Sequence, residues 1–365
     1  MKLVIFGLTF SSSWGNGHAT LWRGLCSALT RQGHHVVFFE RDMPYYAMNR
    51  DLFALPGGEL VIYPDWSSVQ SRVQRELREA DAAIITSYAP DALAATDLVM
   101  SAGRALTVFY DLDTPVTLSR LRRGEAIPYI GPRGLADFDL VLSYTGGAAL
   151  EALRDDLGAR RVVPIYGHVD PDVHRPAEAM PERKFALSYL GTYSADRQGA
   201  LDELFTAAAR ARPDLRFVIG GAQYPQDFPW CPNIFFLHHL PPTDHPAFYG
   251  SSRLTLNVTR RPMVDLGWCP QGRLFEAAAC GVAVLSDAWA GLETFFTPGN
   301  EILVARNTAD ALAALELSDA EIRRIATSAR EHTLAAHTSE RRAHELIAAL
   351  SATTPMPARD ELERA

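Results

Sequence analysis

Two series of short apolar runs, each alternating with amphipathic segments, occupy most of this chain of 365 residues. Runs that are apolar at every position are typical of strands buried on both faces of a sheet, and apolar residues three or four apart are typical of helices that cover it. Such alternation favours a parallel sheet. The sequence therefore predicts an α/β protein with two Rossmann-like domains that face each other across a cleft.

The two series are separated by a segment rich in prolines and charges, residues 167–184, which we interpret as a linker. Strands are predicted before it at 3–8, 35–40, 60–63, 83–87, 106–110, 140–144 and 162–166, and after it at 187–191, 216–220, 234–238, 254–258, 282–286 and 301–304. Helices are predicted at 18–32, 195–211, 273–280 and across 308–351. The predicted domains are 1–170 and 171–340, followed by a C-terminal helix and tail at 341–365, with the last ten residues frayed.

The charge balance and the hydrophobicity exclude several classes of protein. A net charge of -8 argues against a nucleic-acid partner, which demands a basic face. No apolar run approaches the length of a transmembrane helix, and the N-terminal residues read as a first strand rather than a signal peptide. The four cysteines are far apart or in apolar surroundings and form no close metal-type pair, so we expect free thiols in the cytoplasm and no metal site.

A loop rich in glycine and serine follows the first predicted strand and ends at His18. Gly15, Asn16 and Gly17 could let backbone amides approach an anion at the start of the next helix. A histidine in the first helical turn is favoured in its neutral form and could act as a base or hydrogen-bond partner, or it could simply cap the helix. Together with Glu40, the loop also imitates a dinucleotide fingerprint, although its third glycine is missing.

Asp111 and Asp113 follow the predicted strand at 106–110. The carboxyl ends of parallel strands line the ligand crevice, so one of these carboxylates should face a ligand. One of them could equally cap the helix that begins nearby. Both interpretations stay open from the sequence.

In the second half, Gly191 ends a predicted strand and Arg197 lies in the first turn of the following helix. A cation at that position opposes the helix dipole, and it is therefore better explained as a ligand for a diphosphate, because arginine is bidentate and always charged. A solvated surface arginine is the alternative.

The most specific stretch runs from Arg260 to Cys280. Gly272 precedes a helix whose first turn holds Arg273 and Glu276, and a run of small residues follows that allows close packing on a sheet. A buried carboxylate needs partners, and the two hydroxyls of a ribose can supply them. We predict a nucleotide-binding site here.

The segment FEAAACGVAVLSDAWAGLETFFTPGNEILVA at 275–305 resembles the donor-binding segment of GT-B glycosyltransferases of the group 1 type. Further similarity to the CgeB-like branch covers nearly the whole chain, through GHHVVFFERDMPYY, FYDLDTPVTL, VDPDVHRP and SYLGTYSADRQ. The resemblance implies that Glu276 binds the ribose, that Arg197 and Arg273 neutralise the diphosphate, and that Gly15, Gly17 and His18 close over the phosphates or the acceptor. Retaining members often carry a second glutamate where this chain has Trp268.

The function expected from these observations is transfer of a hexosyl group from a UDP- or GDP-sugar to a hydroxyl of a glycan, a lipid-linked sugar, a protein or a small molecule. Arginines and helix N-termini can stabilise the leaving group, so no cofactor and no metal are expected. Asp111 and Asp113 form a DxD-like pair, but in the domain opposite the donor. The alternatives are an NAD-dependent oxidoreductase that uses the Gly15 and Gly17 loop with Glu40, and a non-enzymatic nucleotide-sugar-binding or assembly protein.

Overall fold

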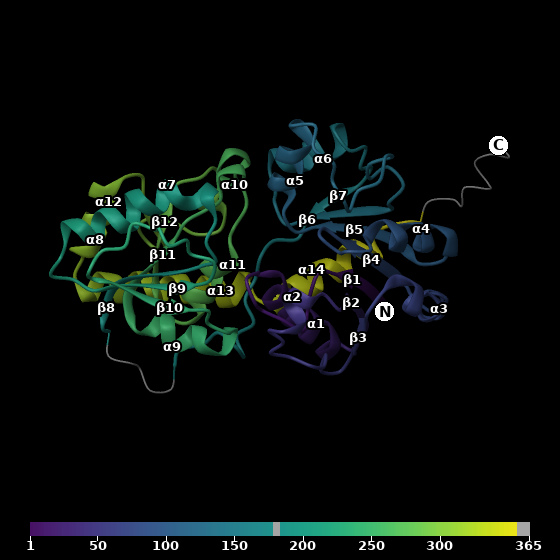
Figure 1. Ribbon diagram of the computed structural model, residues 1–365, viewed down its shortest axis with the longest axis horizontal. Helices are drawn as coiled ribbons and strands as arrows, with labels where there is room; N and C mark the ends of the chain where they lie inside the picture. The colour runs from purple at the N-terminus through teal and green to yellow at the C-terminus, as the bar shows by residue number, and fades with distance from the viewer. Residues whose placement is uncertain (178–182, 356–365) are drawn as a thin grey trace. The chain divides into compact units, whose positions relative to one another are not determined.

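The computed structural model describes residues 1–177 and 183–355, which form two compact units (Figure 1). The first unit comprises Met1–Ser13, His18–Tyr166 and the residues from Ser339 onward. The second comprises Trp14–Gly17 and Gly167–Thr338. Each unit is built around its own parallel sheet, so the predicted fold class, a pair of parallel α/β domains, is confirmed.

The sheet of the first unit has seven strands in the order β3-β2-β1-β4-β5-β6-β7, all paired in parallel. The strands are β1 (Lys2–Gly7), β2 (His35–Arg41), β3 (Glu59–Tyr63), β4 (Ala82–Thr86), β5 (Leu106–Asp111), β6 (Leu140–Ser143) and β7 (Val162–Pro164). The order reverses between β1 and β4, which makes the carboxyl ends of these two strands the topological switch point, the usual ligand position in such sheets.

Helices cover this first sheet, whose central strands are fully buried. They are α1 (His18–Arg31), α2 (Pro44–Ala47), α3 (Trp66–Leu77), α4 (Ala92–Ala102), α5 (Thr114–Arg122), α6 (Ala148–Asp155) and α14 (Ser339–Ser351). The last described helix, α14, lies beside the first, α1 (Figure 1), where Arg31 pairs with Glu340 at 3.4 Å. The two ends of the chain therefore build one unit.

The second sheet has six parallel strands in the order β10-β9-β8-β11-β12-β13. They are β8 (Phe185–Leu190), β9 (Phe217–Gly221), β10 (Ile234–His238), β11 (Ser252–Asn257), β12 (Ala283–Asp287) and β13 (Leu303–Ala305). Here the order reverses between β8 and β11, so the loops that follow these strands form the switch point.

Short helical segments and three longer helices surround the second sheet. The first is a run from Ala195 to Ala211 that contains η1 (Ala195–Arg197), α7 (Gln198–Leu201), the π-helical η2 (Asp202–Thr206) and α8 (Ala207–Ala211). The others are η3 (Pro242–Asp244), α9 (His245–Gly250), α10 (Arg261–Leu266), α11 (Gly272–Ala279), η4 (Leu292–Thr294), α12 (Thr308–Leu315) and α13 (Asp319–Ala336).

Every strand predicted from the sequence is present, with ends that differ by one or two residues. One expectation about burial is wrong: β10 is not covered on both faces, because it lies at the edge of its sheet, and Phe235, Phe236 and Leu237 are exposed. Part of the predicted linker, 178–182, and the predicted frayed end, 356–365, lie outside the described residues.

Candidate functional site

Four of the predicted donor-binding residues lie at the switch point of the second sheet or beside it. Gly191 comes directly after β8 and Arg197 ends the short helix η1. Arg260 follows β11, and Arg273 lies in the first turn of α11. The parallel sheet brings these segments together because the loops after β8 and β11 leave the same edge of adjacent strands.

The arginines of this edge form a positively charged cluster. Arg197 donates to the Thr192 carbonyl at 3.2 Å, and Arg273 donates to the Val258 carbonyl at 3.3 Å. Arg260 forms an ion pair of 2.9 Å with Asp196. Burial lowers the pKa of Arg197, and the nearby charges of Arg273 and Arg260 lower it further. Arg260 is paired with Asp196, whereas Arg197 and Arg273 are held by backbone carbonyls, so the last two guanidinium groups suit an anion.

The pKa of the Tyr189 hydroxyl reflects the positive charge of the arginine cluster. Burial alone would raise the pKa of its hydroxyl, but the charges of Arg273 and Arg197 more than offset burial, and the pKa is lowered. The guanidinium carbon of Arg273 lies 5.2 Å from the centroid of the Tyr189 ring. Tyr189 was not predicted from the sequence, where it reads as one more buried residue of β8.

Gly191 lies directly beside the arginine cluster. A Cβ atom at this position would lie 3.2 Å from Nη2 of Arg273 and 3.0 Å from the Tyr189 hydroxyl. A side chain would therefore push against the arginine cluster. The neighbouring strand approaches equally closely, since a Cβ at Gly221 would lie 2.0 Å from the Gly191 carbonyl oxygen.

Glu276 is held from one side by three polar groups of the second unit. Its Oε2 atom accepts from the Tyr249 hydroxyl at 3.3 Å and lies 3.5 Å from Nδ1 of His245 and 3.9 Å from Nε2 of His174. Burial alone would raise the pKa of Glu276, but His174 and His245 with Arg273 lower it to about 2. The other oxygen, Oε1, lies on the side of Gly272, 3.5 Å from the position of a Cβ there.

His174, His245 and Tyr249 are contacts of this carboxylate that sequence reasoning missed. His174 and His245 are 71 residues apart, so no motif spacing joins them. The two histidines and Glu276 each offer one ligand-type atom, and these atoms lie within 4.8 Å of one another. No local pattern in the sequence displays this grouping, which forms only in the folded chain.

His18 and Asp113 come together at the switch point of the first sheet. Nε2 of His18, the first residue of α1, lies 3.9 Å from Oδ2 of Asp113, which follows β5. Both side chains keep some exposed surface, 14% and 19%. Tyr88, just after β4, lies with its ring 5.7 Å from that of His18 and has a φ of 65°, a conformation that is rare outside glycine and common at functional sites.

Asp111 behaves differently from its neighbour. Its side chain has no exposed surface, and its Oδ1 accepts from the Asp113 backbone N–H at 3.0 Å. Burial raises its pKa to about 6, although the hydrogen bond from Asp113 opposes that rise. Of the two carboxylates proposed from the sequence, Asp113 is therefore the one that faces His18.

Glu40 does not offer a ribose contact, which removes the main support for an NAD site. It is fully buried and accepts from the Phe10 and Ser11 backbone amides at 2.7 and 2.8 Å, and from the Ser11 and Thr9 hydroxyls at 2.6 and 3.1 Å. Both carboxylate oxygens are thus used to hold the loop after β1, and no hydrogen-bonding capacity is directed to a ligand.

The predicted glycine loop lies with the second unit rather than the first. The Trp14 ring lies 5.5 and 4.5 Å from the rings of His238 and His239, after β10. Asn16 donates to the Trp14 carbonyl at 3.0 Å, and Gly15 has a φ of 67°, which favours glycine. The loop is folded on itself and held by its tryptophan.

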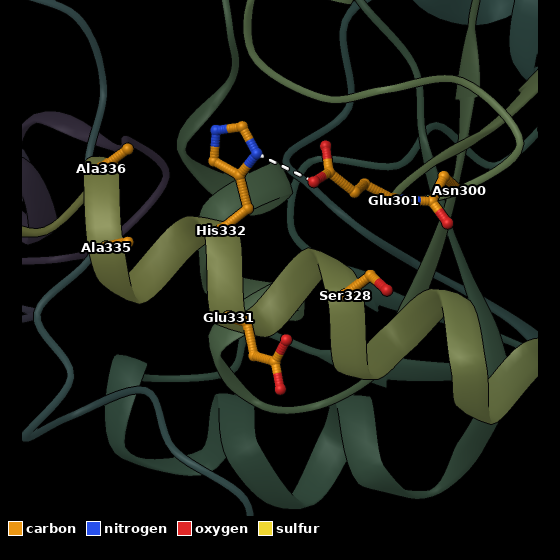
Figure 2. Close-up of a pocket in the computed structure, with 7 residues that line it drawn as sticks. All are labelled: Asn300, Glu301, Ser328, Glu331, His332, Ala335 and Ala336. Carbon is orange, nitrogen blue, oxygen red and sulfur yellow. Dashed lines mark hydrogen bonds and ion pairs between the residues drawn. The ribbon is translucent and has the colours of Figure 1, made fainter.

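A separate hollow of the second unit is lined by the end of α13 and the loop before β13 (Figure 2). Nδ1 of His332 faces Oε1 of Glu301 across it at 3.0 Å. None of the predicted donor residues lines this hollow. Variants of this ion pair can therefore serve as controls for variants of the donor residues.

Comparisons with known proteins agree with this arrangement. A family model described as glycosyl transferase-like matches residues 197–348. No curated protein sequence matches the chain. Among solved structures, a sucrose-phosphate synthase from Thermosynechococcus elongatus is 13% identical, with a TM-score of 0.68 over 95% of this chain and 97% of that one.

Two further structures extend the likeness. Anabaena HepE in complex with UDP and glucose is 15% identical, with a TM-score of 0.68 over 96% of this chain and 99% of that one. The trehalose-6-phosphate synthase OtsA is 12% identical, with a TM-score of 0.67 over 98% of this chain and 100% of that one. Within the described residues, no helix is both long enough and apolar enough to cross a membrane. The fold is the GT-B fold, and the glycosyl transferase-like match over residues 197–348 supports a transferase enzyme.

Proposed function

We propose that this protein transfers a hexosyl group from a UDP- or GDP-sugar to a hydroxyl group of its acceptor, as a CgeB-like glycosyltransferase of the cytoplasm. The observation that carries the proposal is the pairing, in one unit, of an arginine cluster with an ionised carboxylate. Arg197, Arg260 and Arg273 suit a diphosphate, and Glu276 suits the hydroxyls of a ribose. A nucleoside diphosphate presents both chemical groups together.

The leaving diphosphate would be stabilised without a metal ion bound to it. Guanidinium groups fixed in a partly buried site can meet developing negative charge as effectively as a cation from solution. The arginines are fixed before the ligand arrives, through the Thr192 and Val258 carbonyls. We therefore expect magnesium and manganese to leave the affinity for UDP or GDP unchanged.

The acceptor would be activated by groups of the first unit. His18 is positioned to take a proton from an acceptor hydroxyl, and Asp113 would orient the ring and stabilise its charged form. This pairing supports His18 as the base. Asp111 would act on the turn between β5 and α5, because its side chain is fully buried. The loop of Gly15, Asn16 and Gly17 stays a candidate for contacting the phosphates or the acceptor.

Two experiments test the proposal, the first on nucleotide binding and the second on sugar transfer. Calorimetry with UDP, GDP and NAD, each with and without an excess of magnesium, separates a nucleotide-sugar enzyme from an oxidoreductase. A transfer assay with the radiolabelled sugar of the better nucleotide then separates an enzyme from a binding protein. Preferential binding of NAD, or tight UDP binding only with magnesium, would contradict the proposal.

A further inference from the structure

His174, His245 and Glu276 converge on one point inside the second unit. His174 lies in the segment that leads toward β8, His245 begins α9 and Glu276 belongs to α11. The separations are 3.2 Å from His174 Nε2 to His245 Nδ1, 3.5 Å from His245 Nδ1 to Glu276 Oε2, and 3.9 Å from His174 Nε2 to Glu276 Oε2. His174 and His245 are only 1% and 9% exposed.

A hydrogen bond joins only two of the three groups, Nε2 of His174 and Nδ1 of His245, at 3.2 Å. Two of the three separations exceed the 2.7–3.2 Å of an ordinary hydrogen bond that involves nitrogen. Nε2 of His245 lies 3.2 Å from the Leu240 carbonyl oxygen, which can only accept, so in the neutral ring Nε2 carries the proton and Nδ1 presents a lone pair. Nδ1 of His245 therefore faces both Nε2 of His174 and Oε2 of Glu276, and a cation bound between the three atoms would satisfy these acceptors.

The geometry fits a metal ion. The point equidistant from the three atoms lies about 2.1 Å from each, which matches zinc–nitrogen and zinc–oxygen bonds of about 2.0–2.2 Å. The bond from His245 to the Leu240 carbonyl is the outer-sphere contact that orients most metal-bound histidines.

We propose that His174, His245 and Glu276 bind one divalent transition-metal ion, best matched by zinc, with a fourth coordination position open to water or to a ligand hydroxyl. The ion would join the segment before β8 to α9 and α11 through a single atom. It would hold Glu276 by Oε2 and leave Oε1 on the side of Gly272. This site is additional to the arginine cluster and does not replace it in meeting the charge of a diphosphate.

The experiment uses the untagged full chain. Metal is removed by dialysis against a chelator, and Zn²⁺ is titrated by calorimetry into the wild type and into His174→Ala and His245→Ala. We expect one zinc per chain, with affinity at least 100-fold weaker in either variant. His332→Ala is the matched control, because His332 also pairs with a glutamate in the same unit but has no second histidine ligand, and it should bind zinc like the wild type.

A second measurement does not depend on how well the variants fold. Co²⁺ added to the metal-free wild type should give the strong visible absorption of a four-coordinate site, and X-ray absorption of the zinc form should show two imidazoles in the first shell. No stoichiometric zinc, or a first shell without two imidazoles, overturns the proposal. Titration of UDP into the metal-free protein distinguishes a failure of this inference from a failure of the proposed function. UDP binding without zinc binding would overturn only this inference. Zinc binding without UDP binding would overturn only the proposed function.

Discussion

The guanidinium carbon of Arg273 lies 5.2 Å from the centroid of the Tyr189 ring, and the same arginine donates to the Val258 carbonyl at 3.3 Å. A cation held over a ring face and against a carbonyl has little freedom to move away when an anion is absent. The positive charge of the second unit is therefore fixed before a ligand arrives, and a ligand loses little free energy in organising it.

The arginine cluster should distinguish a nucleoside diphosphate from a nucleoside. Arg197→Gln should weaken UDP binding by roughly ten- to hundred-fold, since a charged hydrogen bond contributes about 1.5–3 kcal/mol. Binding of uridine should hardly change. Calorimetry with UDP and with uridine compares the two affinities in the same variant. Arg212→Gln is the control, because Arg212 pairs with Asp214 on the surface of the same unit. Equal losses for UDP and uridine would show that Arg197 is structural.

Glu276→Gln should weaken binding of both the nucleoside and the diphosphate. The amide has almost the volume of the carboxylate, so the fold should persist, and the lost charge should reduce affinity by roughly ten- to hundred-fold. Nucleotide affinity should be measured on metal-free protein, so that the loss of a metal ligand beside the two histidines does not affect the result. Glu301→Gln is the control, since Glu301 pairs with His332 in the hollow of Figure 2. Unchanged uridine affinity would remove the ribose assignment.

His18→Ala should lower turnover and leave the affinity for UDP almost unaltered. A general base contributes about 10²–10⁴-fold to the rate, and it acts in the transition state rather than in donor binding. Asp113→Asn should cause a smaller loss, because it leaves the ring in place. His35→Ala offers a control at an exposed histidine that begins β2. Full turnover in His18→Ala would exclude it as the base.

Asp111 should make the first unit less stable as the pH rises. Its folded-state pKa of about 6 lies above the ordinary 3.8, so the unfolded chain ionises first. Its stabilising contribution is complete below pH 4 and is lost as the pH rises through 6, by about 3 kcal/mol at 1.36 kcal/mol per pKa unit.

Asp111→Asn removes this dependence. Compared with the wild type, the variant should therefore gain stability between pH 4 and pH 7.5. Hydrogen exchange in β5 and β6 under mild urea reports the first unit separately from the second. Asp97→Asn, at an exposed carboxylate of α4, should follow the wild type at every pH. An Asp111→Asn curve parallel to the wild type would show that Asp111 ionises normally.

Much of this fold is predictable from the sequence because buried parallel strands need apolar residues on both faces. Apolar runs mark every strand, and the rule that ligands meet the carboxyl ends of parallel strands then singles out Asp111 and Asp113, which follow β5. The same rule could have drawn attention to Tyr88, which follows β4. Its positive φ, however, is not encoded in any pattern of residue types.

The rest depends on contacts between distant segments. An apolar run predicts a strand but does not tell whether the strand is central or at an edge, and β10 is at an edge. Likewise, an amphipathic period shows that α14 has a buried face but not which sheet receives it. His174 and His245 meet only because the segment before β8 and the start of α9 approach the same helix, α11. Local sequence holds no information about that approach.

The pairing of α14 with α1 has a consequence for the order in which the protein matures. Gln32 contacts the Glu340 carbonyl at 3.2 Å, and Arg342, almost fully buried, donates to the Tyr166 carbonyl at the same distance. A ribosome therefore completes the second unit before it releases the last helix of the first. Until then α1 lacks its contacts with α14, so the unit whose translation begins first is the unit that is completed last.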